Sequence, residues 1–452
     1  MTPAWVSSAV FYHVYPLGLC GAPEHNDFHA VPVSRLKVLH KWIDHLVDLG
    51  VNALYLGPLF ESTGHGYDTA DYFCVDRRLG TNEDLRDFIT ALKARGIRVI
   101  FDAVFNHVGR DFWALRDLQV NGEESRYRDW FYQIDFSRRS PYGDAFSYEG
   151  WAGHYDLVKL NVNHPAVQHH LFEAVRTWIE QFDIDGLRLD AADVIDVNFL
   201  RELSSYTRAV KQDFWLMGEM VHGDYRTLAC DGCLDATTNY ECYKGLYSSH
   251  VDRNYFEIAH SLNRLYGEGG LYRHLTLYNF VDNHDVNRIT SNLTKQAHLY
   301  PLHILLFTMP GVPSIYYGSE WGIQGRRSDS SDRMLRPALD VSTAAATAPE
   351  PNLAGTIARL SAVRKNNPAL QQGHYRQLHV ASESFAFARE TNDQRMIVCV
   401  NSSDNPVGLE LPHLPQGTWV DLLNPGITFE NLSSTLSLQV DPNWGRVLEL
   451  RD

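Results

Sequence analysis

Residues 165–189, PAVQHHLFEAVRTWIEQFDIDGLRL, contain a helical period followed directly by a short strand. Proline is favoured at the first position of a helix, and Pro165 stands there. The apolar residues that recur behind it at helical spacing are Leu171, Val175, Trp178 and Phe182. Residues 186–189 then form an apolar run of strand length. The stretch predicts a helix and the strand that follows it, which is the repeating unit of an α/β fold.

The same unit recurs along most of the chain. Eight strand-like runs, most of them separated by helical periods, are predicted at residues 10–15, 51–56, 97–104, 186–189, 214–217, 234–237, 275–281 and 314–317. Strands that alternate with helices pair in parallel, and eight of them favour closure into a (β/α)8 TIM barrel. Such a barrel takes about 250 residues. A chain of 452 residues therefore has room for further domains.

Two regions break the alternation. Residues 107–163 are irregular and rich in aromatic and charged side chains, so they predict a small domain B inserted after the third strand. Residues 374–452 change to an alternation of period two, which predicts a C-terminal antiparallel β-sandwich domain. The barrel itself is then expected over residues 1–106 and 164–373.

The charge and the cysteine content exclude several classes of partner. The net charge of −15 disfavours nucleic acid, which needs a basic surface, and gives no help in binding anionic membranes. A neutral substrate such as a sugar is compatible with it. The sequence has no apolar run of transmembrane length and no signal peptide in its first residues, MTPAWVSSAVFYHVYP. Because the six cysteines are scattered, we expect a cytoplasmic protein, with its oligomeric state open.

Charged and polar residues stand where several predicted strands end. At or just after the end of the third strand stand Asp102, Asn106 and His107, and at the end of the fourth stand Arg188 and Asp190. The fifth strand ends at Glu219, and the seventh at residues 282–285, DNHD. In a TIM barrel the carboxyl ends of the strands form one rim, and active sites lie there. We therefore expect these side chains to meet at one site.

Two of the acids have surroundings that predict opposite roles. Arg188 and Asp190 are two residues apart on a strand, so their side chains point to the same face. A guanidinium lowers the pKa of a neighbouring carboxylate and keeps it ionised, as a nucleophile requires. Glu219 follows Leu216 and Met217, and an apolar surround keeps a proton on a carboxyl group, as a general acid requires. Carboxyl groups paired in these roles are typical of retaining glycosidases.

Four segments carry a family resemblance: DAVFNHVG (102–109), GLRLDAAD (186–193), GEM (218–220) and FVDNHD (280–285). They resemble, in this order, the four signature regions of glycoside hydrolase family 13, the α-amylase family. HGYDTADYF (65–73) resembles the family's segment after the second strand. The resemblance extends over the whole chain and is greatest to the α-amylase, neopullulanase and cyclomaltodextrinase group. It implies a barrel with an inserted B domain and a C domain.

The resemblance also implies roles for single residues. The implied catalytic residues are Asp190 as nucleophile, Glu219 as general acid/base and Asp285 as stabiliser of the transition state. The implied substrate-binding residues around the reacting sugar ring are Tyr67, His107, Arg188 and His284. Asp102 is implied to be chiefly structural. The resemblance implies no required cofactor. The counterpart of Asn106 often binds calcium in the family, so the resemblance allows a calcium ion at Asn106.

The implied reaction is hydrolysis of α-1,4-glucosidic bonds in maltooligosaccharides, cyclodextrins or starch-type α-glucans through a covalent glycosyl-enzyme intermediate. One alternative passes the same intermediate to a sugar, as transglycosylases, glucanotransferases and isomerases of the family do. Another is an inactive barrel that only binds carbohydrate, which the presence of all three carboxylates disfavours. Chain length, endo or exo action and tolerance of α-1,6 bonds depend on the insert and on the loop at residues 320–333.

Some of these residues also have simpler interpretations. Asp190 and Arg188 could form only a buried ion pair, and Tyr67 could be a packing residue. The aromatic residues of the insert, which are either sugar-stacking platforms or its small core, are Trp130, Trp151, His154 and Tyr155. Cys230 and Cys233 form a C-x-x-C pattern, but no second pair or histidine stands at the spacing of a zinc site.

Overall fold

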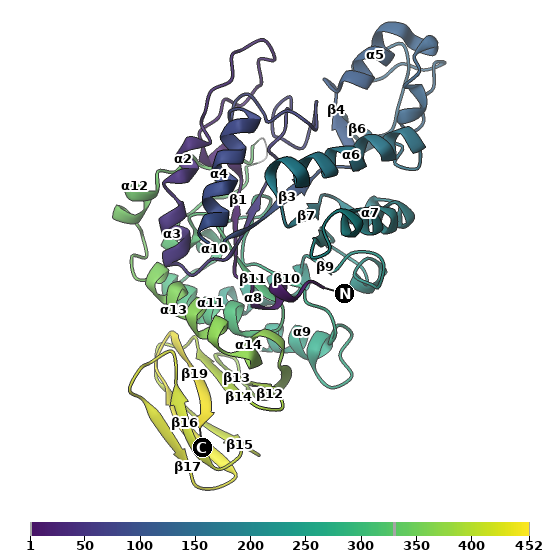
Figure 1. Ribbon diagram of the computed structural model, residues 1–452. Helices are drawn as coiled ribbons and strands as arrows, with labels where there is room; N and C mark the ends of the chain where they lie inside the picture. The colour runs from purple at the N-terminus through teal and green to yellow at the C-terminus, as the bar shows by residue number, and fades with distance from the viewer. Residues whose placement is uncertain (1, 329–330, 452) are drawn as a thin grey trace.

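The computed structural model describes residues 2–328 and 331–451. Eight parallel strands form one sheet in the order β10-β11-β1-β2-β3-β7-β8-β9 (Figure 1). They are β1 (Phe11–Val14), β2 (Ala53–Leu56), β3 (Arg98–Ala103), β7 (Gly186–Leu189), β8 (Trp215–Gly218), β9 (Ala236–Thr237), β10 (Tyr278–Asn279) and β11 (Val312–Tyr316). A parallel bridge between Thr238 and Tyr278 joins the two edges of the sheet. The predicted barrel is confirmed, and each of the eight predicted runs overlaps one of its strands.

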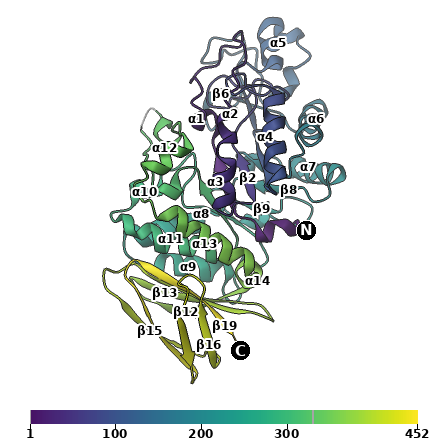
Figure 2. The same ribbon diagram turned by 60° about the vertical axis from the view of Figure 1, so that its left-hand side comes forward.

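Helices follow most of the strands and cover the outside of the barrel (Figures 1 and 2). They are α1 (Pro16–Leu19), α2 (Lys37–His40), α3 (Ile43–Asp48), α4 (Asn82–Ala94), α6 (Pro165–Phe182), α7 (Val197–Val210), α8 (Tyr240–Val251), α9 (Phe256–Tyr266), α10 (Ile289–Asn292), α11 (Leu299–Thr308), α12 (Val341–Ala346), α13 (Leu353–Asn366) and α14 (Pro368–Gln372). Local sequence sets their ends. The helix α6 starts at Pro165, is capped by the side chain of His164, and stops where Asp183 turns into the left-handed region with φ 50°.

Apolar side chains fill the amino end of the barrel. Phe11 of β1 and Trp215 of β8 stack with their ring centroids 5.2 Å apart, and Met217 and Tyr278 belong to the same apolar cluster. Trp5, in the segment before β1, packs against these residues from outside. Because this end is apolar and buried, the polar residues of the strands are left to the opposite, carboxyl end.

The segment after β3 is more regular than the sequence indicated. Its strands β4 (His107–Gly109), β5 (Gly150–Trp151) and β6 (His154–Lys159) form a three-stranded antiparallel sheet, and α5 (Trp113–Asn121) packs beside it. The strands are too short to produce a periodic sequence signal. In Figure 1 this insert projects from the end of the barrel that lies away from the C-terminal strands.

The C-terminal strands form two packed antiparallel sheets, as predicted. The larger contains β12 (His374–Val380), β13 (Ser384–Glu390), β14 (Arg395–Asn401), β16 (Gly417–Asp421), β17 (Thr428–Asn431) and β19 (Trp444–Arg451), and the smaller contains β15 (Val407–Pro412) and β18 (Thr435–Val440). Trp419, Leu411 and Leu436 lie in the core between them. Over the described residues, no helix combines the length and the apolar character that crossing a membrane requires.

Candidate active site

The strand register places the predicted site residues on one rim. Asp102 of β3 pairs in register with Arg188 of β7, and Leu189 pairs with Gly218 of β8. Asp190 and Glu219 therefore follow the ends of neighbouring strands, and the amide of Glu219 donates to the carbonyl of Leu189 at 2.9 Å. The carboxyl end of the barrel brings the predicted acids together, as the sequence indicated.

The guanidinium of Arg188 is the centre of this rim. It is 3% exposed, and its Nη1 lies 2.8 Å from Oδ1 of Asp102 and 2.8 Å from Oδ1 of Asp190. Its Nη2 lies 2.8 Å from Oε2 of Glu219. Burial alone would lower the pKa of Arg188, but Asp102 and Glu219 raise it well above the ordinary value. One permanent cation thus holds three carboxyl groups within a few ångströms of one another.

The electrostatics of Asp190 differ from the expectation. Burial raises its pKa well above the ordinary value, and the nearby Glu219 and Asp102 raise it further, while Arg188 opposes them. Arg188 does lower this pKa, as predicted, but in the site without substrate burial and the neighbouring acids outweigh it, so the expected net lowering is not found. The cluster therefore holds protons more tightly than an isolated carboxylate does.

The surroundings of Glu219 are polar rather than apolar, so the prediction of an apolar surround was wrong. Besides Arg188, the carboxylate accepts a hydrogen bond from the backbone amide of Ala191 at 3.1 Å. Ala191 has φ 45°, in the left-handed region, and this turn is what lets an amide that follows Asp190 reach the glutamate. Tyr240, at the start of α8, points its hydroxyl at Oε1 from 3.5 Å. The apolar Leu216 and Met217 lie in the barrel wall behind, not around the carboxyl group.

Asp285 has the opposite electrostatics to Asp190. Burial would raise its pKa, but His284, Arg336 and Arg188 lower it below the ordinary range. The imidazole Nε2 of His284 lies 2.9 Å from Oδ2 of Asp285, and Nη2 of Arg336 lies 3.1 Å from Oδ1. This carboxylate is therefore held ionised on the rim.

Tyr67 and His284 form a second layer beside these acids. Their rings stack with centroids 5.3 Å apart, and the Tyr67 hydroxyl contacts both the His284 imidazole and Oδ2 of Asp102, the latter at 2.9 Å. Tyr55 donates to the same Asp102 oxygen at 2.7 Å. The carboxylate oxygens of Asp102 thus accept hydrogen bonds from Arg188 and two tyrosines, so Asp102 is a structural part of the site.

His107 faces Asp190 from the first strand of the insert. Its Nε2 lies 3.9 Å from Oδ2 of Asp190, and its Nδ1 pairs with the side-chain amide of Asn106 at 3.1 Å. Since the amide NH₂ of Asn106 donates, the ring proton belongs on Nε2, which has no partner in the described structure. Burial lowers the pKa of His107 to about 3, so the ring is a neutral donor.

The surroundings of Asn106 contain acids and a cation together. A pocket of about 250 Å³ lies beside Asn106, and its wall includes Asp193, Asp196 and Lys159. The Lys159 ammonium, 2.7 Å from Glu149, already supplies a positive charge there. Within residues 2–328 and 331–451, no three histidine, cysteine, aspartate or glutamate side chains converge as metal ligands. Calcium therefore enters no step below, and whether the protein needs it stays a prediction.

Two residues of the rim were not anticipated from the sequence. Arg336 follows the predicted loop at 320–333, of which residues 329 and 330 lie outside the described part of the chain. Its Nε also donates to the His284 carbonyl at 3.0 Å. Tyr240 starts the helix after the sixth barrel strand, which no motif marks. A charged residue after a loop and a tyrosine at the start of a helix give too weak a sequence signal to be selected without the structure.

The aromatic residues of the insert differ in their distance from the site, and the cysteines form no bonds with one another. Trp151 lies 5.7 Å from the His107 ring, whereas Trp130 is buried against Trp113 in the insert's own core. The six cysteines are free thiols in the structure, Cys230 and Cys233 included. Trp151 is thus the aromatic side chain of the insert placed closest to the predicted site histidine.

Comparisons with known proteins agree with the geometry. The family profile described as "Alpha amylase, catalytic domain" matches residues 34–348, and that described as "Maltogenic Amylase, C-terminal domain" matches residues 375–443. A cyclomaltodextrinase from Geobacillus thermopakistaniensis is 30% identical over 99% of this chain and 77% of its own length.

Two solved structures match nearly end to end. The cyclic α-maltosyl-(1→6)-maltose hydrolase from Arthrobacter globiformis, in complex with that sugar, has a TM-score of 0.83 and 26% identity over 99% of both chains. The Nostoc punctiforme debranching enzyme has a TM-score of 0.82 and 27% identity, again over 99% of both chains. With its signature residues gathered on one barrel rim, the chain belongs to the α-amylase family of glycoside hydrolases, family 13.

Proposed function

We propose that the protein hydrolyses α-1,4-glucosidic bonds of maltooligosaccharides, cyclodextrins or starch-type α-glucans with retention of the α configuration. The observation that carries the proposal is that Asp190 and Glu219 bind the two terminal nitrogens of one guanidinium, that of Arg188. This arrangement supports a nucleophile and an acid/base held close together, as the retaining mechanism requires. Two relatives are named cyclomaltodextrinase and cyclic α-maltosyl-(1→6)-maltose hydrolase, and these names support small or cyclic α-glucans as substrates.

In the first step Glu219 donates a proton to the leaving glycosidic oxygen. An oxygen of Asp190 attacks C1 of the sugar, the C1–O bond breaks, and a glycosyl ester forms. Burial and the neighbouring acids raise the pKa of Asp190 before substrate arrives, so its proton must pass to Glu219 before Asp190, as a carboxylate, attacks C1. As the carbon becomes electrophilic, Arg188 stabilises the carboxylate form of Asp190.

In the second step Glu219 removes a proton from water, and the hydroxide attacks C1 from the side that the leaving group vacated. The ester breaks, Asp190 is released as a carboxylate, and Glu219 is again protonated. Two inversions at C1 leave the product with its α configuration.

The other rim residues act on the ring and its developing positive charge. Asp285, held ionised by His284 and Arg336, accepts hydrogen bonds from ring hydroxyls and stabilises the oxocarbenium-like transition state. His107 offers its unpartnered Nε2–H to the same ring. Tyr67 packs one face of the sugar, as the family resemblance implies.

The test is a product time course on maltoheptaose, a cyclodextrin, pullulan and soluble starch, with the anomer of the first product read by NMR. The α anomer should appear first, and the Asp190→Asn variant should lower kcat by about four orders of magnitude or more. An initial β anomer, or near-normal activity of the variant, would remove the proposal. Products longer than the substrate would assign glycosyl transfer in place of hydrolysis.

A further inference from the structure

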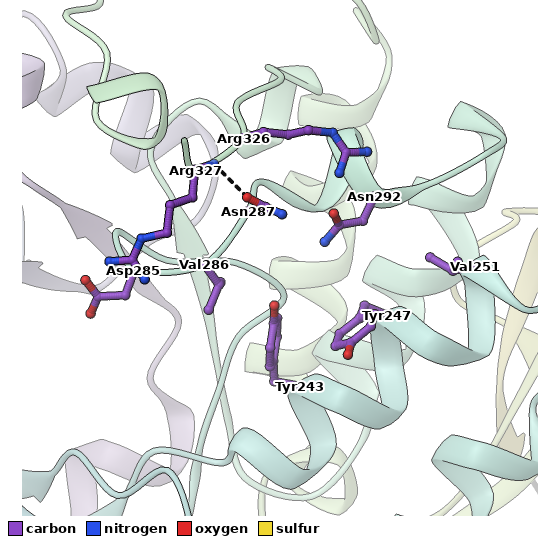
Figure 3. Close-up of a pocket in the computed structure, with 9 residues that line it drawn as sticks. All are labelled: Tyr243, Tyr247, Val251, Asp285, Val286, Asn287, Asn292, Arg326 and Arg327. Atoms are coloured by element: carbon purple, nitrogen blue, oxygen red, sulfur yellow. Dashed lines mark hydrogen bonds between the residues drawn. The ribbon is translucent and has the colours of Figure 1, made fainter. Parts of the chain in front are cut away.

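Two features near the active-site rim take no part in the proposed reaction. One is a pocket of about 480 Å³ between α8 and Arg326 (Figure 3). Figure 3 shows the carboxyl group of Asp285 directed away from this pocket, so the pocket is separate from the reacting groups. The other feature is the C-x-x-C pair, Cys230 and Cys233, in the loop between β8 and β9. Two neighbouring thiols have a chemistry of their own, because they can be oxidised to a disulfide.

The loop places Cys230 and Cys233 at the two ends of a tight turn. The amide of Cys233 donates to the carbonyl of Cys230 at 3.0 Å, which closes a β-turn. Gly232, the third residue of the turn, has φ 77°, the positive value that a type II turn needs at this position. The first and last Cα atoms of a β-turn lie less than about 7 Å apart, and a disulfide joins Cα atoms about 4.4–6.8 Å apart. The backbone therefore already holds the pair at a separation that a disulfide can span.

The two thiols differ in their access to solvent. Cys230 is partly exposed, whereas Cys233 is fully buried in the core behind it. Burial raises the pKa of Cys233 to about 11, and a hydrogen bond between the two thiols contributes to the rise. The thiolate is the nucleophile in disulfide exchange, and exchange begins at an accessible sulfur. A reagent in solution therefore reacts with Cys230 first, and Cys233 is in place to attack second.

The turn is packed against the end of the strand that precedes Glu219. The amide of Leu234 donates to the carbonyl of Leu228 at 3.0 Å, so these two residues close the base of the turn. Their side chains reach Gly218, where even a Cβ atom would lie 2.6 Å from Cδ1 of Leu234. Because Gly218 directly precedes Glu219, a cross-link in the turn would fix the apolar support behind the proposed acid/base.

We propose that Cys230 and Cys233 form a reversible disulfide, and that this bond locks the turn behind Glu219 under oxidising conditions. The oxidant is a low-molecular-weight disulfide such as glutathione disulfide. The Cys230 thiolate attacks one of its sulfur atoms, the S–S bond breaks, and one glutathione thiolate leaves. The Cys233 thiolate then attacks the Cys230 sulfur and displaces the second glutathione. The departing thiolates take up the two cysteine protons, so two cysteines are oxidised to one disulfide and one glutathione disulfide is reduced to two thiols.

This bond is independent of the proposed hydrolysis, because forming it needs no sugar and no catalytic carboxylate. A reducing cell interior keeps permanent disulfides rare, and the disulfides found there are usually transient or redox-sensing. An accessible pair such as Cys230 and Cys233 is therefore expected to follow the thiol–disulfide balance of its surroundings, opening and closing with it.

Peptide mass mapping tests whether the bond forms. The reduced protein is incubated with glutathione disulfide at pH 8, and the remaining thiols are blocked with iodoacetamide. The peptide with Cys230 and Cys233 should lose two hydrogen atoms and take no label, and dithiothreitol should restore both thiols. Cys74 is the internal control, because this exposed thiol should carry glutathione instead. Glutathione on Cys230 with Cys233 still free, or two unmodified thiols while Cys74 reacts, would overturn the proposal.

Two variants separate the roles of the thiols. In Cys233→Ser the exchange should stop with glutathione on Cys230, because no second thiol displaces it. In Cys230→Ser the buried Cys233 should stay unmodified. If Cys233 instead reacts readily in Cys230→Ser, the proposed order of attack is wrong.

Thermal unfolding tests whether the bond locks the turn. Oxidation should raise the melting temperature of the wild type by about 2 °C, because the cross-link restricts the unfolded chain, and should not raise that of Cys230→Ser. Cys74 reacts alike in both proteins, so the difference between them reports the disulfide. A bond that forms without raising the wild-type melting temperature would overturn the lock.

Discussion

Buried arginines at two places in this protein have their charge stabilised in different ways. Arg188 at the barrel rim is surrounded by carboxylates, and its pKa is raised. Arg364 and Arg389, between the barrel and the C-terminal sheets, bind backbone carbonyls, and no acid pairs with either in the described residues. Burial lowers the pKa of both to about 9, which still leaves them charged at neutral pH.

The partners explain the difference. Arg364 donates to the carbonyls of Phe307 and Leu370, near the ends of α11 and α14, and to that of Gly311 at 2.6 Å. Carbonyls at the C-terminal end of a helix carry a partial negative charge, so they stabilise a cation without titrating. At the rim the partners of the arginine are carboxyl groups, which exchange protons. At the junction between the barrel and the C-terminal sheets the partners are backbone carbonyls, which do not. We therefore expect charge at the rim to serve chemistry and charge at the junction to serve domain attachment.

The largest expected effect separates the two arginines by activity. Arg188→Met should lower kcat/KM by about 10³ or more, because the guanidinium that stabilises Asp190 and positions Glu219 is lost. Arg364→Met should leave kcat/KM within about twofold, since its contacts lie at the other end of the barrel. Initial rates on maltoheptaose measure both. A comparable loss in Arg364→Met would show that the junction also shapes the active site.

A second prediction separates them by stability. Arg364→Met leaves several buried carbonyls without donors, and should lower the free energy of unfolding by about 3 kcal/mol. Because no titratable partner is involved, the loss should be the same at pH 5 and pH 8. Arg188→Met should instead destabilise more at pH 8 than at pH 5, because the buried carboxyl groups then lose the cation that they share.

Thermal unfolding at the two pH values measures these losses. Arg359→Met is the matched control, because Arg359 lies on the same helix, is exposed, and makes one carbonyl contact through its guanidinium at 3.1 Å. It should change the free energy of unfolding by no more than about 0.5 kcal/mol. A strongly pH-dependent loss in Arg364→Met would contradict the comparison.

A smaller effect is expected from Asp190→Asn. The pKa of Asp190 is raised in the folded protein, so the folded state holds its proton more tightly than the unfolded chain does. Its favourable contribution is present at low pH and is lost as the pH rises through the folded pKa. The variant should therefore match the wild type near pH 4 and melt a few degrees higher at pH 8. A lower melting temperature at pH 8 would mean that Arg188 outweighs burial after all.

These differences also mark how far the sequence could predict the site. Strand-end motifs were sufficient to place Asp102, Arg188, Asp190 and Glu219 on one rim, because register follows from the order of parallel strands. Protonation could not be predicted the same way. It depends first on burial of the acids and then on how they share one guanidinium, and Arg188 contacts three of them.

The fold shows the same division. Barrel strands could be located from apolar runs, whereas the short strands β4 and β5 of the insert could not, because three and two residues show no periodicity. Arg336 reaches Asp285 from a loop, and loop paths leave no repeating pattern in sequence. The buried Arg364 resembles a surface residue of an ordinary helix until its carbonyl partners, far away in the chain, are known.

The smallest expected effect concerns calcium. The pocket beside Asn106 already contains the Lys159 ammonium, which is paired with Glu149 and lies 5.0 Å from the Tyr132 ring centroid. We expect this cation to oppose a divalent ion although Asp193 and Asp196 also line the pocket. Chelation with EDTA should thus leave the melting temperature and the rate on maltoheptaose unchanged, and added calcium should not raise either. In Lys159→Ala the repulsion is removed, so any response to calcium should be confined to that variant. A fall of several degrees on chelating the wild type would establish a tight site that its oxygen ligands complete in spite of the lysine.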